Sequence, residues 1–307
     1  MRKQYRFPTE NAEYSYKIKW QYEVVYESQE VDSEYQLKLD IDNTINAHNK
    51  TEFIDALHSV ISGRARLALN EYEKNGNIFE LKQNFHVIAL LQSLGRSKAK
   101  NQHRYMFTKA NFSNPLYAVM SDSNKAINSC CEKLISVDKN FATKDNKYKL
   151  FTHIYQLVIF DNYNDAKKQI KKLRQLKNRI MMDDSHLEVL EFYDLFLSRD
   201  KVGLENLLLS MATNIERRFG WGEELFKLMT LLSYDLRLVN PMDYAKLCWL
   251  KGIEVEINHP GIPMELLPIS PLPQYFDEYD FLSPKWKPPQ MGVIAELKRW
   301  YQVIRSL

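Results

Sequence analysis

The chain has 307 residues, of which 45% are hydrophobic and 26% charged, a composition typical of a folded globular protein. Its 42 lysines and arginines nearly balance 39 aspartates and glutamates, so the net charge is only +3. That balance argues against nucleic acid as the main partner, because dedicated nucleic-acid binders are strongly basic. The cysteines are too few for a disulfide framework and indicate a reducing compartment; they are Cys130, Cys131 and Cys248.

The sequence shows no targeting or membrane segment. Its first residues are basic at Arg2, Lys3 and Arg6, but no apolar run and no small-residue cleavage site follow, so we predict no signal peptide. The most apolar stretch, residues 154–160, is much shorter than the roughly 20 residues that cross a bilayer. We therefore expect a cytoplasmic protein that does not enter the membrane.

Proline placement divides the chain into two regions of different character. Pro8 and Pro115 are the only two prolines before residue 241, whereas nine lie between Pro241 and Pro289. An interior proline removes a helix hydrogen bond and costs about 3 kcal/mol. The first four fifths of the chain can therefore be helical almost throughout, while the last fifth must contain turns and extended segments.

The fold class predicted from this pattern is all α. Apolar residues recur with a period of 3.6 over residues 51–76, and again over 79–94, where Gly95 supplies a helix stop. Pro115 starts a third helix. Further helices are predicted at 122–137, 146–160, 164–181, 185–198, 202–218, 223–238, 242–251 and 291–305. The predicted parts are an N-terminal arm at 1–48, a helical core at 49–251, and a proline-rich segment with a terminal helix packed on the core at 252–307.

The connectors between residues 146 and 238 are only a few residues long. Short connectors force successive helices to run antiparallel, so this region should form stacked helical hairpins. The expected geometry resembles tetratricopeptide or HEAT-like arrays. The 34-residue signature of tetratricopeptide repeats is absent, so the sequence does not predict a true repeat protein.

The N-terminal arm follows a different pattern. Aromatic and aliphatic residues alternate with polar residues over 14–26, which is typical of a β-strand. A helix also fits, because Tyr14, Ile18 and Tyr22 share one helical face. The one strand partner that the sequence offers is the segment 253–257, and strand and helix both stay open.

The sequence contains no recognisable catalytic, metal or cofactor motif. Its seven histidines do not stand at ligand spacing from one another or from a cysteine, and no P-loop, Gly-x-Gly-x-x-Gly or nucleophile elbow is present. The helix at 164–181 is rich in lysine and arginine, but Ala166, Ile170 and Leu173 mark a separate core-facing stripe. We interpret the basic residues as its solvated sides, and expect neither an enzyme nor a metal or cofactor protein.

An acidic and aromatic segment stands out in the proline-rich region. Carboxylates that alternate with aromatic rings suit a basic partner surface, because the charges steer encounter and the rings supply rigid contact area. The alternative is an ordinary packed loop with exposed acids. The predicted partner-binding residues are Tyr275, Phe276, Asp277, Glu278, Tyr279 and Asp280. A second feature, the turn formed by Gly220, Trp221 and Gly222, is predicted to be structural, with the Trp221 ring buried between helices.

The residues at 216–224, 243–255 and 258–268 resemble the closing part of a bacterial immunity protein. The pattern is a late helix, the Gly252-Ile253 turn, an extended segment, and then Ile-Pro and Leu-Leu-Pro. It is similar to the immunity protein 49 family of polymorphic toxin systems, over roughly residues 50 to 282. The resemblance implies an all-helical, non-catalytic inhibitor that binds a cognate toxin, often a nuclease, in the cytoplasm of the producing cell. The alternative is a helical scaffold or regulator that binds peptide or nucleic acid in a groove.

Overall fold

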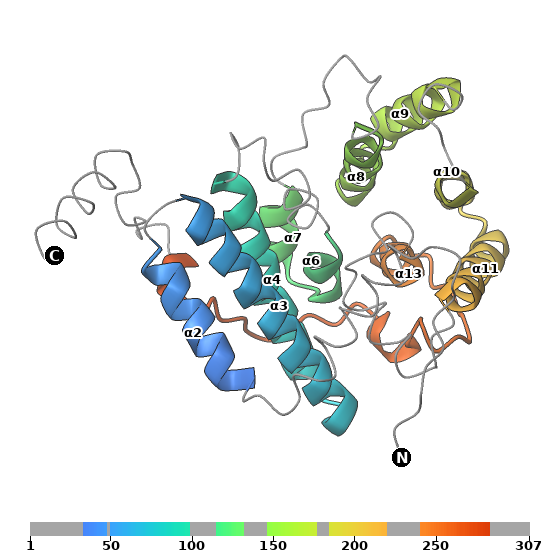
Figure 1. Cartoon of the computed structure of the whole chain (residues 1–307). Helices are drawn as coiled ribbons and strands as arrows, with labels where there is room; N and C mark the ends of the chain where they lie inside the picture. Colours follow the sequence, from blue (N-terminus) through green and yellow to red (C-terminus); the bar gives the residue numbers. More distant parts are fainter. Residues whose placement is uncertain are drawn as a thin grey trace, which may run out of the picture. The chain divides into compact units, whose positions relative to one another are not determined.

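The computed structural model describes residues 33–47, 50–98, 115–131, 146–176, 184–219 and 240–282. Within these ranges the fold is all α, as predicted, without a β-strand (Figure 1). The described residues divide into two compact units. We call the described residues between 115 and 271 the hairpin unit. We call residues 33–98 together with residues 272–282 the three-helix unit. The predicted boundary after residue 251 falls inside the hairpin unit, and the one at 48–49 lies outside the described residues.

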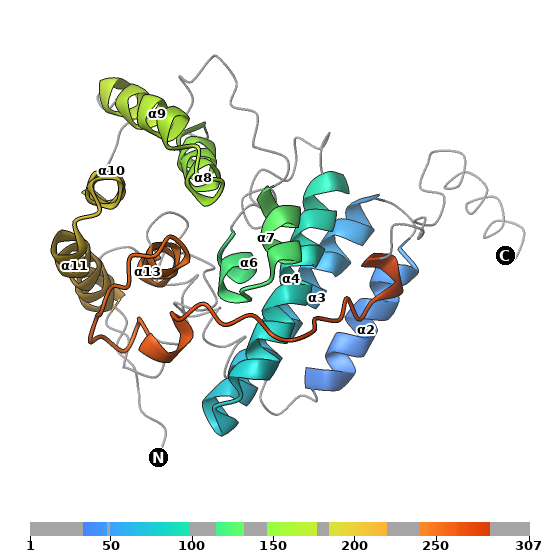
Figure 2. The ribbon, with the colours of Figure 1, turned by 180° about the vertical axis from the view of Figure 1, so that it is seen from behind.

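Three long helices build the three-helix unit and lie side by side in both views (Figures 1 and 2). They are α2 (Ser33–Ile45), α3 (Lys50–Asn75) and α4 (Ile78–Lys98). The core between α3 and α4 consists of large apolar side chains, among them Phe53, Ile54, Leu57, Leu81, Phe85 and Ile88. Full burial of one such side chain contributes about 1.5–3 kcal/mol. Packing of these faces therefore holds the helices together.

Helix α4 is buried from residue 81 to residue 92. It continues to Lys98, so the predicted stop at Gly95 is wrong. A glycine inside a helix costs about 1 kcal/mol relative to alanine. Gly95 is itself buried, and the packing of α4 outweighs that local preference.

The hairpin unit contains seven described helices. They are α6 (Leu116–Met120), α7 (Asn124–Cys131), α8 (Asn146–Ile159), α9 (Tyr163–Leu176), α10 (Asp184–Ser198), α11 (Lys201–Phe219) and α13 (Pro241–Leu250). Those from α8 onward begin and end within a few residues of the predicted bounds, except that the chain after Leu176 is not described. The helices predicted at 223–238 and 291–305, and the N-terminal alternation at 14–26, lie outside the described residues.

Two successive hairpins, α8–α9 and α10–α11, have the same turn. Asp161 and Arg199 stand 38 residues apart and both have a left-handed backbone, with φ of 58° and 56°. The next residue of each hairpin donates its N–H to a carbonyl of the preceding helix, from Asn162 to Leu157 at 2.8 Å and from Asp200 to Leu195 at 3.0 Å. Asn162 and Asp200 then cap α9 and α11 with their side-chain oxygens.

The buried faces of the two hairpins repeat at the same spacing of 38 residues. Equivalent buried pairs are Phe151 and Val189, Ile154 and Phe192, Tyr155 and Tyr193, Val158 and Phe196, Ala166 and Leu204, Ile170 and Leu208, and Leu173 and Met211. Most pairs differ in residue type, and what they share is burial. The region is thus a pair of structurally equivalent hairpins, and the predicted antiparallel hairpin geometry is confirmed.

Helix α13 is attached to both hairpin turns. Pro241 is the first residue of α13, and Asn240 before it is the N-cap. The side-chain oxygen of Asn240 accepts a hydrogen bond from the N–H of Met242 at 3.1 Å. At the other end of α13, Lys251 donates to the carbonyl of Ile159 at 2.6 Å and to Asp161 at 2.8 Å. Arg199 of the second turn donates to the carbonyl of Gly252 at 2.9 Å. The polar side chains of the two turns therefore fix the end of α13.

The chain after α13 is irregular, as the prolines predict. Residues 253–257 are extended, and buried and exposed side chains alternate along them. Short 3-10 turns follow at η3 (Met264–Leu266) and η4 (Asp280–Leu282). This segment carries the predicted partner-binding residues.

Candidate partner-binding site

The predicted partner-binding segment lies against α3 and α4. In Figure 2 the red chain that ends at η4 runs in front of these helices. We call residues 275–281 the docked segment. The residues that hold it are Arg64 of α3 and Gln83 and His86 of α4, which we call the cradle. All three cradle side chains are nearly or fully buried.

Gln83 holds the backbone of the docked segment. Its amide nitrogen donates to the carbonyl of Phe276 at 2.8 Å, and its amide oxygen accepts from the N–H of Phe276 at 3.2 Å. The side-chain amide thus pairs with the backbone groups of Phe276 as a neighbouring strand would. The same nitrogen lies 2.6 Å from the Glu278 carboxylate.

Arg64 binds two side chains of the docked segment. One of its terminal nitrogens donates to the Tyr279 hydroxyl at 2.6 Å, and the other donates to the Glu278 carboxylate. The guanidinium also lies 5.3 Å from the centre of the Tyr279 ring, within the range of a cation–π contact. Burial raises the pKa of Tyr279, and the positive charge of Arg64 opposes that rise.

His86 contacts the beginning of the docked segment. Its Nε2 lies 3.4 Å from a carboxylate oxygen of Asp277, and its ring centre lies 4.8 Å from that of Tyr275. Because His86 is fully buried, these neighbours define part of its surroundings. The three cradle residues therefore contact one short acidic and aromatic peptide, and Gln83 and Arg64 share the Glu278 carboxylate.

The docked segment has a fixed but partly open conformation. Glu278 has a left-handed backbone, with φ of 62°, which is uncommon for a residue other than glycine. Its aromatic anchor is Phe281, which is buried and stacks on Tyr279 with ring centres 4.9 Å apart. Phe276 is 54% exposed, and Asp280 is exposed as well. Glu278 is exposed too, but its carboxylate, like that of Asp277, contacts the cradle.

A buried lysine fixes the chain that leads to the docked segment. In the hairpin unit, Lys246 donates to the carbonyls of Leu266, Leu267 and Pro268 at 2.9–3.1 Å. Its ammonium also lies 2.7 Å from a carboxylate oxygen of Asp122. Three consecutive carbonyls that would otherwise lack a helix or sheet partner are satisfied in this way.

Several buried groups inside the hairpin unit have raised pKa values. Burial raises the pKa of Asp243 to about 7, although the hydrogen bond from the Tyr155 hydroxyl opposes the shift. Tyr193 and Tyr244 lie nearby and their pKa values are raised by burial. Burial likewise raises the pKa of the Cys248 thiol. These groups are enclosed by the core, so a substrate could not reach them in this conformation.

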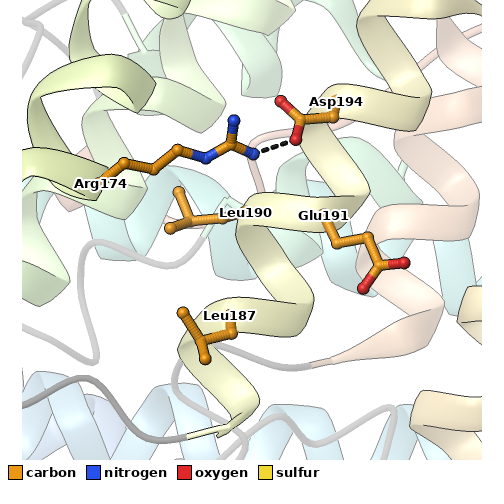
Figure 3. Close-up of a pocket in the computed structure, with 5 residues that line it drawn as sticks. All are labelled: Arg174, Leu187, Leu190, Glu191 and Asp194. Carbon is orange, nitrogen blue, oxygen red and sulfur yellow. Dashed lines mark hydrogen bonds and ion pairs between the residues drawn. The ribbon is translucent and has the colours of Figure 1, made fainter. Parts of the chain in front are cut away.

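A small surface pocket lies between α9 and α10 (Figure 3). It has a volume of about 300 Å³ and is lined by Arg174, Leu187, Leu190, Glu191 and Asp194. Arg174 and Asp194 form an ion pair at its rim. Asp243 and the tyrosines around it do not line this pocket, so the perturbed groups and the open space are separate.

Two further properties bear on candidate chemistry. Among the residues that the structure describes, no group of three or more histidine, cysteine, aspartate or glutamate side chains could hold a metal ion. No described helix is both long and apolar enough to span a bilayer. The predicted structural turn at Gly220, Trp221 and Gly222 lies outside the described residues, so burial of Trp221 stays a prediction.

Comparisons with known proteins give no relative. No family model, no curated protein and no solved structure matches the chain. The site has to be interpreted from its own geometry.

Proposed function

We propose that this chain works by binding another protein and has no catalytic activity of its own. The observation that carries this proposal is the pair of equivalent hairpins, α8–α9 and α10–α11, related by a spacing of 38 residues. Stacked helical hairpins form extended surfaces that proteins use to bind partners. A regular stack of this kind places side chains of successive helices at even intervals, which suits recognition of a protein surface.

The position of the perturbed groups supports a binding role. Catalytic acids and bases with shifted pKa values normally face a cleft that admits substrate. Asp243 instead faces Tyr155 in the core, and its neighbours Tyr193 and Tyr244 are buried too. The interpretation that fits this arrangement is a polar cluster that specifies how α13 packs against α8 and α10.

We propose further that the partner is a toxin, which the chain neutralises as an immunity protein. This part rests on the resemblance of residues 216–224, 243–255 and 258–268 to immunity protein 49. Within the described part of these stretches, the residues form α13, the Gly252 turn and the extended chain after it. They are packing and turn residues, so they bear on the fold and leave the contact surface to be found.

The docked segment is the proposed contact with a cationic toxin. Phe276 and Asp280 have exposed side chains, and the cradle holds the backbone of Phe276 and the side chain of Glu278. Pre-organisation lowers the ordering cost of binding, which otherwise reaches about 0.5–1.5 kcal/mol per immobilised side chain. The proposed contact with the toxin therefore consists of the Phe276 ring and the Asp280 carboxylate, which stand on a fixed backbone.

Co-expression tests the immunity function. The toxin domain encoded beside this chain should stop growth of a host cell when expressed alone, and co-expression of this chain should restore growth. The purified proteins should form a complex. Failure to rescue growth, together with failure to bind, would exclude the immunity function.

Two single variants then test the contact. Asp280→Ala should slow association at low salt, because exposed charges steer encounter. Phe276→Ala should speed dissociation, since loss of a buried anchor costs about 2 kcal/mol or more, roughly 30-fold in affinity. Wild-type kinetics for both variants, measured by surface plasmon resonance at two salt concentrations, would move the contact away from the docked segment.

The alternative function is a scaffold that binds peptide or nucleic acid, and the basic face of α9 is the observation that favours it. Lys167, Lys168 and Lys171 are exposed, while Ala166 and Ile170 are buried. Lys168 forms an ion pair with Asp165 on the same helix, which reduces the local positive charge. Binding of fluorescent single-stranded RNA that weakens steeply with salt would support this alternative.

A further inference from the structure

The cradle contains more polar groups than a purely structural contact requires. Arg64, Gln83 and His86 are 7%, 6% and 0% exposed, and they stand on two core helices. A buried polar side chain costs stability unless it is hydrogen-bonded, and apolar replacements at such positions are often neutral or stabilising. The three polar side chains therefore make the contact specific for the groups that they bind.

The contacts of the cradle resemble those of a peptide-binding site. Gln83 holds a backbone peptide group through both its oxygen and its nitrogen, as in recognition of extended peptides by strand addition. Arg64 requires a carboxylate and a phenol hydroxyl at adjacent positions, here Glu278 and Tyr279. His86 contacts Asp277. The cradle thus recognises a backbone group, an acidic side chain and a tyrosine in a fixed order.

The docked segment has properties of a ligand that can be replaced. Its Asp277 and Glu278 side chains remain 36% and 31% exposed, so solvent and competitors can reach these contacts. The left-handed backbone of Glu278 is held by its contacts with Arg64 and Gln83. Backbone strain of this kind is characteristic of functional sites.

We propose that the cradle on α3 and α4 is a recognition site for an acidic–aromatic peptide. This chain fills the site with its own residues 275–281, and a segment of the same chemistry from a partner protein can take their place. The partner is defined by a carboxylate followed directly by tyrosine, with a further acidic residue before them. The inference does not rest on the toxin proposal, because it concerns the cradle under the docked segment and an acidic partner, whereas the toxin is proposed to contact the outward side chains of that segment.

Competition within the chain sets the expected behaviour. A segment tethered by a short linker has an effective concentration on the order of millimolar, so an added peptide binds the wild-type chain weakly. Weakening the internal contact raises the fraction of open cradle, and the apparent affinity for added peptide rises in proportion. A change in the docked segment should therefore improve binding of the peptide, whereas a change in the cradle should abolish it.

The test uses a fluorescein-labelled peptide with the sequence of residues 275–281 and capped ends, titrated with the full chain and followed by anisotropy. Glu278→Ala in the chain removes the carboxylate that both Arg64 and Gln83 bind, and should increase peptide affinity by about tenfold or more, the change that loss of one charged hydrogen bond produces. Addition of Arg64→Met to this variant should abolish the gain. Asp42→Ala is the control, because it also removes an exposed carboxylate from the three-helix unit, and it should behave as wild type.

The outcomes separate recognition from simple packing. Circular dichroism and thermal melting establish that each variant is folded, and Glu278→Gln, which keeps the side-chain size, replaces Glu278→Ala if the latter unfolds. A second peptide, in which glutamine replaces the glutamate that corresponds to Glu278, should not bind the chain that carries Glu278→Ala. If the folded Glu278 variant binds the peptide no better than wild type, or equally well with Arg64→Met, the cradle is a packing contact and the proposal is wrong.

Discussion

The ammonium of Lys246 lies 2.7 Å from the carboxylate of Asp122, and both side chains are fully buried. Lys246 also donates to three carbonyls of residues 266–268, and the second oxygen of Asp122 accepts from the N–H of Ser270 at 3.1 Å. Asp122 has a left-handed backbone, with φ of 57°. One buried ion pair thus joins α13, the turn after α6 and the proline-rich chain.

Lys246→Met should destabilise the protein strongly. The variant keeps the length of the side chain but removes the positive charge beside Asp122 and the donor to three carbonyls, and removal of one partner from a buried pair costs about 3–5 kcal/mol. Urea unfolding measures the loss. The double variant Lys246→Met, Asp122→Asn should be less destabilised than the sum of the single variants, since asparagine accepts a left-handed backbone and carries no charge. Additive losses would contradict a coupled pair.

Asp243→Asn should change how stability depends on pH. Burial raises the folded-state pKa of Asp243 from 3.8 to about 7, so the folded protein holds a proton that the unfolded chain has lost between these values. The contribution of this group to stability is therefore complete below about pH 4 and is lost as the pH rises towards 7. At about 1.36 kcal/mol per pKa unit the total loss is on the order of 4 kcal/mol.

The Asp243→Asn variant has no carboxyl group to titrate at this position, so its free energy of unfolding relative to wild type should rise between pH 4 and pH 7. Urea unfolding at intervals of one pH unit gives the difference, in which groups shared by both proteins cancel. Tyr155→Phe serves as a companion variant, because loss of its hydrogen bond removes an interaction that lowers the Asp243 pKa. A constant difference between Asp243→Asn and wild type across this range would show that Asp243 is ionised in the folded core.

The sequence predicted the helices well because periodicity reports burial directly. It did not predict the 38-residue repeat, since the two hairpins share buried positions more than residue types, as with Ile154 and Phe192 or Ala166 and Leu204. Their turns also lack a sequence signal, because Asp161 and Arg199 occupy a position where glycine is usual. A repeat defined by packing is visible only once the buried face of each helix is known.

The site was half predictable for a similar reason. Residues 275–280 stood out by composition, but the cradle residues are 191 to 215 positions away in the chain, and no local pattern links them. The available signal was the cluster of polar residues Lys82, Gln83, Asn84 and His86 inside a helix that is buried from residue 81 to residue 92. Long-range pairing decides which polar residues of a helix face solvent and which face another segment, and one sequence does not contain that information.

Lys251→Met should test how α13 is attached to the hairpin turns. Lys251 donates to the carbonyl of Ile159 and to Asp161, and its side chain is only 12% exposed. Loss of hydrogen bonds from a charged group costs about 1.5–3 kcal/mol. Lys201→Met is the matched control, because solvent screens its ion pairs with Glu205 and Glu256 and their loss should change stability little. Equal losses in denaturant unfolding would show that Lys251 acts as an ordinary surface lysine.

Two glycine substitutions should shift stability in opposite directions. A Cβ at Gly203 would lie 2.6 Å from the Asp200 carboxylate that caps α11 and 2.7 Å from a methyl group of Leu195, closer than real contacts allow. Gly203→Ala must displace the cap, whose loss costs about 0.5–2 kcal/mol. At Gly63, inside α3, a Cβ would meet only Leu37 at 3.6 Å, an ordinary contact.

Gly63→Ala should therefore stabilise the protein by up to about 1 kcal/mol, because alanine loses less backbone entropy than glycine in a helix. Each substitution adds the same single methyl group, so the difference between the two variants isolates local geometry from composition. Thermal melting of both proteins in one buffer gives the comparison, with Gly203→Ala expected below wild type and Gly63→Ala above it. Stabilisation by Gly203→Ala would mean that the turn before α11 can open without loss, and that the shared hairpin turn does not depend on the Asp200 cap.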